Sequence, residues 1–228
     1  MGTRGLTCVF ENGKYRVAQY GQWDHYPSGQ GAIILSFLRG EPARDKLSYP
    51  SNEPTYGTTG IVYDEETFLK GLQKCRVVTP EEAQAMWDEA GAEGKEWVGM
   101  DVCQKMQKMY PTMERCLGAL ILPYIQKQEE EGEESIPVQI NLNFAGNSLF
   151  CEWAYVIDYD TRMFEVYEGC VKSGPAEGRF AEYDYQPEHR DEEDRYYPVR
   201  LAASWSLDDL PTLDEFIRTL TPPVEDDE

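Results

Sequence analysis

Two stretches that alternate apolar and polar residues flank the dipeptide Asn12-Gly13 near the start of the chain. An Asn-Gly pair supplies the positive φ angles that a two-residue turn needs, so these stretches are predicted to form a β-hairpin. A similar alternation near the other end predicts a second hairpin. Hairpins near both ends, with helical patterns between them, predict an α+β fold in which helices pack on a mainly antiparallel sheet. The predicted strands cover residues 6–10, 14–20, 153–158, 163–167 and 199–204.

The middle of the chain carries helical patterns. Residues 32–38 are almost wholly apolar, which predicts a helix buried against the sheet. Thr79, Pro80 and Glu82 form a helix start with a capping hydroxyl, a first-turn proline and an acid at the third helical position. The spacing of the apolar residues in residues 138–150 fits a strand and a helix equally. Helices are predicted over residues 32–38, 65–74, 79–90, 102–109, 112–128 and 213–220, with loops over residues 39–60 and 169–195 and a linker over residues 129–134.

The 228 residues are enough for a hydrophobic core without disulfide support. We expect one α+β domain over residues 1–220, followed by an acidic tail at residues 221–228. A strand that begins near the N-terminus also suits a layered fold like that of the N-terminal-nucleophile hydrolases, which use a first Thr, Ser or Cys as nucleophile. Removal of Met1 would expose Gly2 here, so such a fold would lack its nucleophile.

The composition is strongly acidic: 42 Asp and Glu residues against 21 Lys and Arg residues give a net charge of −21. This charge repels phosphate backbones and anionic lipid surfaces at long range, so direct nucleic-acid binding and membrane binding are not expected. The longest apolar run, residues 117–125, is also far too short to span a bilayer. Acids cluster in residues 129–134, 191–194 and 225–228, which we interpret as solvated loops or tails.

The six cysteines form no CxxC pair and have no regular spacing, so free thiols in a reducing cytoplasm are expected. The two histidines, His25 and His189, lack the spacing of zinc ligands, and neither a metal nor a cofactor is expected. The sequence contains no Walker A loop, no GxSxG elbow and no GxGxxG after a strand. Nothing in the sequence indicates an oligomeric state.

The candidate site is the loop of residues 23–31, which places Trp, Asp, His and Tyr side by side ahead of a glycine-rich turn. The imidazole of His25 suits proton transfer near neutral pH. The first hairpin returns the chain toward its start, so we predict that Arg4 lies beside this loop and pairs with Asp24 or holds an anionic ligand. The candidate ligand-binding residues are Arg4, Trp23, Asp24, His25, Tyr26, Gly29 and Gly31.

Four segments spread over the chain are distinctive: the start MGTRGL, the run AQYGQWDHYPSGQG, and residues 79–92 and 150–169. Together they resemble a family of uncharacterised proteins from bacteriophages, prophages and gut bacteria. The resemblance implies a phage-encoded accessory protein in the cytoplasm of a bacterial host cell. It brings no reaction and no catalytic residue with it.

These observations favour a non-enzymatic accessory protein that binds a protein partner or a small ligand. A small hydrolase or transferase centred on residues 23–31 is the first alternative. The second is a DNA mimic, whose carboxylates take the place of phosphates, although many of the acids fall in predicted tails and loops.

Overall fold

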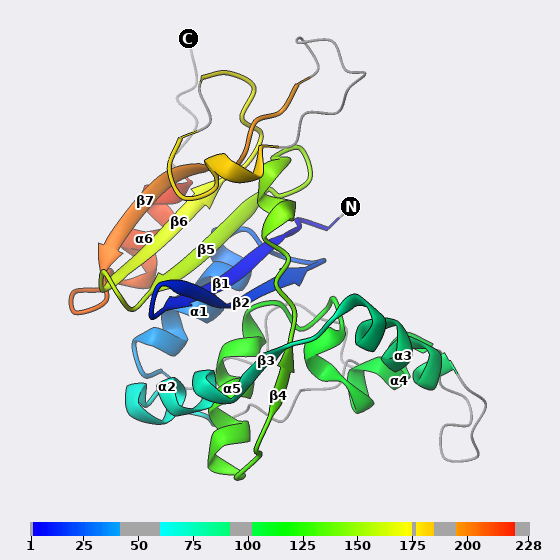
Figure 1. The fold of residues 1–228 in the computed structure, drawn as a ribbon. Helices are drawn as coiled ribbons and strands as arrows, with labels where there is room; N and C mark the ends of the chain where they lie inside the picture. Colours follow the sequence, from blue (N-terminus) through cyan, green and yellow to red (C-terminus); the bar gives the residue numbers. More distant parts are fainter. Residues whose placement is uncertain (1, 42–59, 92–101, 175–176, 185–194, 222–228) are drawn as a thin grey trace, which may run out of the picture.

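The structure of this chain, a computed structural model, describes residues 2–41, 60–91, 102–174, 177–184 and 195–221. Its centre is a five-stranded sheet in the order β2-β1-β5-β6-β7 (Figure 1). Its neighbouring strands pair antiparallel except for β1 and β5, which run parallel. This arrangement confirms the predicted α+β class and the mainly antiparallel sheet. The strands are β1 (Gly5–Glu11), β2 (Lys14–Gly21), β5 (Trp153–Asp158), β6 (Met163–Glu168) and β7 (Arg200–Ser206).

The two hairpins are joined at their turns. Asn12 and Gly13 have φ angles of 53° and 71°, in the left-handed region that the Asn-Gly pair predicts. Their backbone N–H groups both donate to the carboxylate of Asp160, in the β5–β6 turn, at 2.7 Å. Because β1 and β5 run side by side in the same direction, the turns that follow them meet at one edge of the sheet.

Helices cover one face of the sheet (Figure 1). The predicted helix α1 (Ala32–Leu38) is buried along its whole length, and α6 (Leu213–Leu220) packs beside it. Two further helices, α2 (Glu65–Lys74) and α5 (Ile121–Glu130), pack on each other and extend the same core. The sheet contributes Val9, Ile157 and Phe164, among others, to this core.

Short turns cover the opposite face of the sheet. The alternate strand residues Leu6, Cys8 and Val156 point to a second core, which Leu142 and Phe180 complete. Both faces of β1 and β5 are therefore buried, and this explains why these strands are rich in apolar residues on both sides of the alternation. The covering turns are the 3-10 turns η5 (Leu142–Gly146) and η6 (Ala181–Tyr183).

A small parallel sheet pairs β3 (Cys75–Val77) with β4 (Ile136–Val138). The chain that follows β4 runs along the edge strand β2, where Ile140 forms a bridge with Ala18. Within the described residues the two sheets thus lie side by side and do not stack. This arrangement differs from the layers of the N-terminal-nucleophile hydrolases that were considered from the sequence.

The helices α3 (Pro80–Gly91) and α4 (Val102–Met109) pack on each other beside the small sheet (Figure 1). Their shared cluster includes Val78 and Met113. The predicted start of α3 is confirmed, because the Glu82 N–H donates to Thr79 Oγ1 at 3.2 Å and the Thr79 N–H donates to the Glu82 carboxylate at 3.0 Å.

The predicted helix over residues 112–128 is wrong in its first half, since α5 begins only at Ile121. Gly118 has a φ of 51°, which interrupts a helix. The Ala119 N–H donates to the side chain of Gln30 at 2.8 Å. A side chain from a distant part of the sequence therefore takes the place of helical hydrogen bonds, and the local periodicity does not reveal this. The turns in this stretch are η3 (Pro111–Met113) and η4 (Gly118–Leu120).

Two further expectations need correction or completion. The acidic run at residues 129–134 is only partly a linker, because Glu129 lies in α5 and pairs with Lys74 of α2. Residues 138–150 form neither a long strand nor a long helix, since β4 ends at Val138 and the chain then turns through η5.

The features that lie outside the described residues are His189, the acidic runs 191–194 and 225–228, residues 222–228 of the tail, and parts of the predicted loops at residues 42–59, 175–176 and 185–194.

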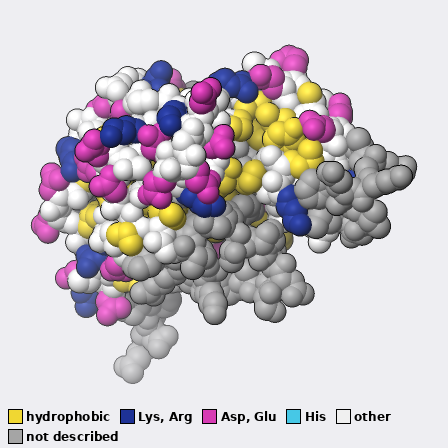
Figure 2. Space-filling view, turned by 90° about the horizontal axis from the view of Figure 1, so that it is seen from below, with side chains coloured by type: hydrophobic (Ala, Val, Ile, Leu, Met, Phe, Trp, Pro, Cys, Tyr) yellow, Lys and Arg dark blue, Asp and Glu magenta, His cyan; other side chains and the backbone are white. Residues whose placement is uncertain are grey.

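One face of the described surface mixes both signs of charge. Figure 2 views the molecule from the end that carries α2 and α5, and acidic and basic side chains are interspersed there. Ion pairs within and between these two helices contribute to this mixing. They are Lys70 with Glu66, Lys74 with Glu129, and Lys127 with Glu131.

Candidate functional site

The loop of residues 23–31 is mostly packed into the molecule. His25 is 0% exposed, whereas Trp23, at 39%, is the most open of the aromatic and histidine side chains in this loop. The His25 N–H donates to the Thr3 carbonyl at 3.1 Å, which confirms that the loop lies beside the start of the chain. The loop is therefore mostly buried and is not the open contact surface that its composition indicated.

The His25 imidazole occupies the space above two glycines that pair across β1 and β2. A Cβ atom would lie 2.6 Å from ring atom Cδ2 if added to Gly5, and 1.8 Å from Cε1 if added to Gly21. Nδ1 donates to the Trp23 carbonyl at 3.2 Å, while Nε2 has no hydrogen-bond partner within the described chain. Burial lowers the pKa of His25 to about 4, so the ring is neutral at pH 7.

The glycines of the loop allow close packing. A Cβ atom on Gly29 would lie 2.1 Å from the Asp24 carbonyl oxygen, and one on Gly31 would lie 2.8 Å from the Tyr155 hydroxyl. That hydroxyl donates to the His25 carbonyl at 2.7 Å. The close packing of the loop on the sheet therefore explains why residues 29 and 31 are glycines.

Gly29→Ala is expected to lower the free energy of unfolding by about 1–3 kcal/mol, because the added methyl group must displace backbone atoms. Urea denaturation followed by circular dichroism measures this loss. Gly91→Ala is the matched control, since a Cβ atom there would meet no atom of the described residues within 4 Å. Equal losses in the two variants would contradict the close packing of Gly29.

Arg4 lies at the predicted end of the sheet but makes no ion pair with Asp24 in the described structure. Its guanidinium carbon lies 4.8 Å from the ring centroid of Phe150, and its backbone N–H donates to Glu152 at 3.2 Å. Asp24 instead lies close to Tyr26. Burial raises the pKa of Tyr26, and the negative charge of Asp24 raises it further. The structure thus separates Arg4 from the other polar candidates.

An open cleft lies at the edge of β2, and we call it the Tyr20 cleft. Tyr20 meets Phe144 edge to face, with ring centroids 4.9 Å apart, and the Tyr20 hydroxyl donates to Gln22 at 2.6 Å. The volume of about 370 Å³ falls within the range of small-molecule sites. The cleft is lined by Tyr20, Ile140, Asn141, Asn143 and Phe144.

The pKa of the Tyr20 hydroxyl reflects its burial and the charges around it. Burial raises the pKa of Tyr20, and the positive charges of Arg4 and Arg115 oppose that rise. The Gln22 N–H donates to the Arg115 carbonyl at 2.9 Å, which places Arg115 next to the residue that binds the Tyr20 hydroxyl. The cleft itself is lined by aromatic, aliphatic and amide side chains, and neither arginine is among its lining residues.

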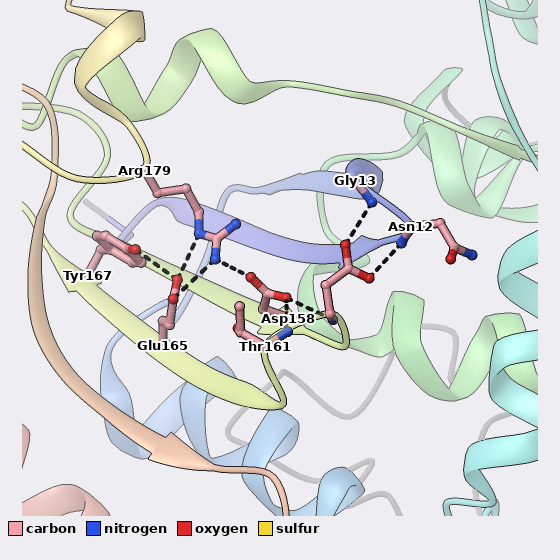
Figure 3. Close-up of polar contacts among 8 residues, drawn as sticks. Asn12, Gly13, Asp158, Thr161, Glu165, Tyr167 and Arg179 are labelled. Carbon is pink, nitrogen blue, oxygen red and sulfur yellow. Dashed lines mark hydrogen bonds and ion pairs between the residues drawn. The ribbon is translucent and has the colours of Figure 1, made fainter.

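A buried ion-pair cluster on the second face of the sheet is the other concentration of charge (Figure 3). Arg179 pairs with Asp158 and, at 2.8 Å, with Glu165, which also accepts the Tyr167 hydroxyl. Burial by itself would raise the pKa of Asp158, but bonds from the Thr161 N–H and from Arg179 hold it below its usual value. Each charged group has a partner inside the cluster, so we interpret it as a structural link between the sheet and residues 177–184.

No family model, curated protein or solved structure matches this chain. The geometry alone must therefore indicate the function. Across the described ranges, no helix has the length and apolar character needed to cross a bilayer. The same residues contain no group of three His, Cys, Asp or Glu side chains placed to hold a metal ion. None of the six cysteines, all of which lie within the described residues, forms a disulfide bond.

Sequence reasoning missed the Tyr20 cleft, because none of its lining residues was among the predicted ligand-binding residues. One signal was present: the polar residues Gln139, Asn141 and Asn143 alternate with apolar ones, which is typical of a row of amides along an extended segment. Their approach to Tyr20 depends on the bridge that joins β2 to Ile140. That contact links distant parts of the sequence, so the alternation does not reveal it.

Proposed function

We propose that this protein is a non-enzymatic accessory protein that binds a small ligand in the Tyr20 cleft. One observation carries the proposal: the rings of Tyr20 and Phe144 and the amides of Asn141 and Asn143 meet around an open space of about 370 Å³. An apolar surface with a few hydrogen-bonding groups is the usual composition of a ligand site. The size of the cleft favours a small ligand over a protein partner as its occupant.

The protonation states of the buried groups favour binding over catalysis. His25, the candidate acid or base, is fully buried, and its pKa of about 4 leaves it neutral at pH 7. Burial raises the pKa of the Cys8 and Cys151 thiols, so neither is present as a reactive thiolate. The hydrolase or transferase alternative therefore lacks an accessible acid–base histidine in residues 23–31.

The resemblance to phage and prophage proteins supports a role in phage–host interplay in the cytoplasm of a bacterial host cell. The DNA-mimic alternative has less support. Such a mimic needs a continuous acidic face, whereas basic side chains are interspersed with the acids on the face in Figure 2.

A thermal-shift screen of small polar compounds tests the proposed function. Tyr20→Leu and Asn143→Ala are expected to abolish the shifts caused by cleft ligands, because they remove an aromatic face and an amide. Asn143 is exposed, so its truncation is expected to change the melting temperature of the free protein little. Leu201→Ala, at a 49% exposed position on β7, is the control that keeps the shifts. Shifts that survive both cleft substitutions would contradict the proposal.

A further inference from the structure

The five-stranded sheet has two outer strands, β2 and β7, and they differ in how their outer sides are covered (Figure 1). At β2, the Ala18 N–H donates to the Gln139 carbonyl at 3.3 Å, and the Asn141 N–H donates to the Ala18 carbonyl at 3.0 Å. At β7, no backbone hydrogen bond among the described residues joins the outer side to another segment. The unpaired N–H and C=O groups of an edge strand form a template for a further strand.

The sequence of β7 lacks the side chains that usually protect such an edge. Charged residues and prolines commonly keep edge strands from pairing with other molecules. Residues 201–207 contain neither, although 28% of the chain is charged. One register shift against β6 leaves Ala202 as an extra residue, and residues 203–206 pair regularly with β6. This regular and uncharged part of β7 is suited to pairing with a partner strand.

Half-buried apolar side chains continue from β7 into α6, which packs next to this strand. They pack against the main core and remain partly open to solvent. The residues are Ala203, Trp205, Leu207, Leu210, Leu213 and Ile217. A second molecule that extends the sheet at β7 would remove more of this apolar surface from water, which favours association.

The charges at the two ends of the uncharged segment favour a second copy of the chain as the partner. Arg200 precedes the segment and Asp208 follows it. Arg200 is exposed and donates to the Ser173 carbonyl, but it forms no ion pair among the described residues. The Asp208 side chain pairs with Arg162 and is still 68% exposed. If two β7 strands pair antiparallel about Ser204, Arg200 of each copy lies opposite Asp208 of the other.

We infer that the protein forms a symmetric dimer in which β7 pairs antiparallel with β7 of a second copy, centred on Ser204. The same register places Ala203 opposite Trp205 of the other copy, and a shift in either direction separates Arg200 from Asp208. A two-fold axis perpendicular to the sheet keeps the two α6 helices on one face of the joined sheet. The net charge of −21 on each copy opposes association, so an uncharged edge is a favourable place for close approach.

Sedimentation velocity of the full-length protein tests the dimer over about a hundredfold range of concentration. Salt at about 0.15 M limits the long-range repulsion, because charges are then screened over about 8 Å. With rising concentration, a species of twice the 26.2 kDa chain mass is expected. A protein that stays monomeric over the whole range would overturn the inference, and another protein's strand would then be the partner that remains for β7.

Ser204→Lys is expected to weaken the dimer at least about tenfold, because it places two like charges directly opposite each other at the axis. Ser204 is exposed, so the substitution is expected to leave the monomer folded. The added lysine also lowers the net negative charge, so general repulsion would not account for a loss of dimer. Ser204→Thr is the matched control, since threonine is uncharged and suits a strand, and it is expected to keep the dimer.

A charge exchange tests the register. Arg200→Glu and Asp208→Arg are each expected to weaken the dimer, because each places like charges opposite each other. The double variant is expected to recover most of the association, since opposite charges then face each other again. Circular dichroism verifies that every variant folds.

Two further results would contradict the inference. A dimer that persists in Ser204→Lys associates through another surface. A dimer that ignores both single charge reversals, or that does not recover in the double variant, is not centred on Ser204. Because β7 and the Tyr20 cleft lie at opposite edges of the sheet, either result leaves the proposed ligand binding to its own test.

Discussion

Replacing Arg179 by Met is expected to lower the free energy of unfolding by about 3–5 kcal/mol, because it leaves a buried carboxylate without its cation. The Asp158 side chain is 2% exposed and would remain next to Glu165 with no positive charge. Methionine retains an apolar stem that can pack on Phe10, over whose ring the guanidinium carbon now lies at 5.0 Å. The loss, measured by urea denaturation at pH 7, thus reports mainly on the charge.

Arg162→Met is the matched control. Arg162 also joins two carboxylates, Glu65 at 2.7 Å and Asp208 at 2.5 Å, but its side chain is 37% exposed, so a loss of about 1 kcal/mol or less is expected. Adding Asp158→Asn and Glu165→Gln to Arg179→Met is expected to restore much of the lost stability, because no buried charge then remains. A similar loss in both single variants, or no recovery in the triple variant, would contradict this account.

Acidification from pH 6.5 to pH 4 is expected to remove about 3 kcal/mol of stability through His25. The folded-state pKa of about 4 lies below the ordinary value of 6.5, so the unfolded chain binds a proton in this window and the folded chain does not. Protonation therefore favours unfolding: the His25 contribution is complete above pH 6.5 and declines as the pH falls toward 4. The buried Nε2 has no acceptor in the described residues that would stabilise the added charge.

His25→Phe tests this dependence, because phenylalanine fills a similar space and does not titrate. The variant is expected to lose less stability than the wild type between pH 6.5 and pH 4, whatever its stability at pH 7. Other titrating groups, including His189, are common to both proteins and cancel in the difference. Parallel stability curves for the two proteins over this range would show that His25 titrates normally in the folded state.

The candidate site illustrates how a loop can be located correctly and its role misjudged. Residues 23–31 have the composition of a contact loop, and the proximity of this loop to the start of the chain follows from the hairpin. His25 is not the exposed acid or base that the sequence suggested. Its ring is buried in the space above Gly5 and Gly21, which pair across β1 and β2. Arg4 lies over the ring of Phe150 and forms no ion pair with Asp24 in the described structure.

Local chemistry in the sequence determined the elements of this fold. The Asn12-Gly13 turn follows from backbone sterics, the start of α3 from a capping pair, and the burial of α1 from an unbroken apolar run. Each of these features is decided by residues that are close together in the chain. The same local reasoning predicted the class of the fold and both hairpins.

Contacts between distant segments decided the rest. The parallel pairing of β1 with β5, the break before α5 where Gln30 binds Ala119, and the bridge from Ala18 to Ile140 all join residues far apart in the sequence. Periodicity indicates which side of a strand is apolar but not which segment it meets. The Tyr20 cleft depends on such contacts, so only the tertiary structure brings its aromatic and amide groups together.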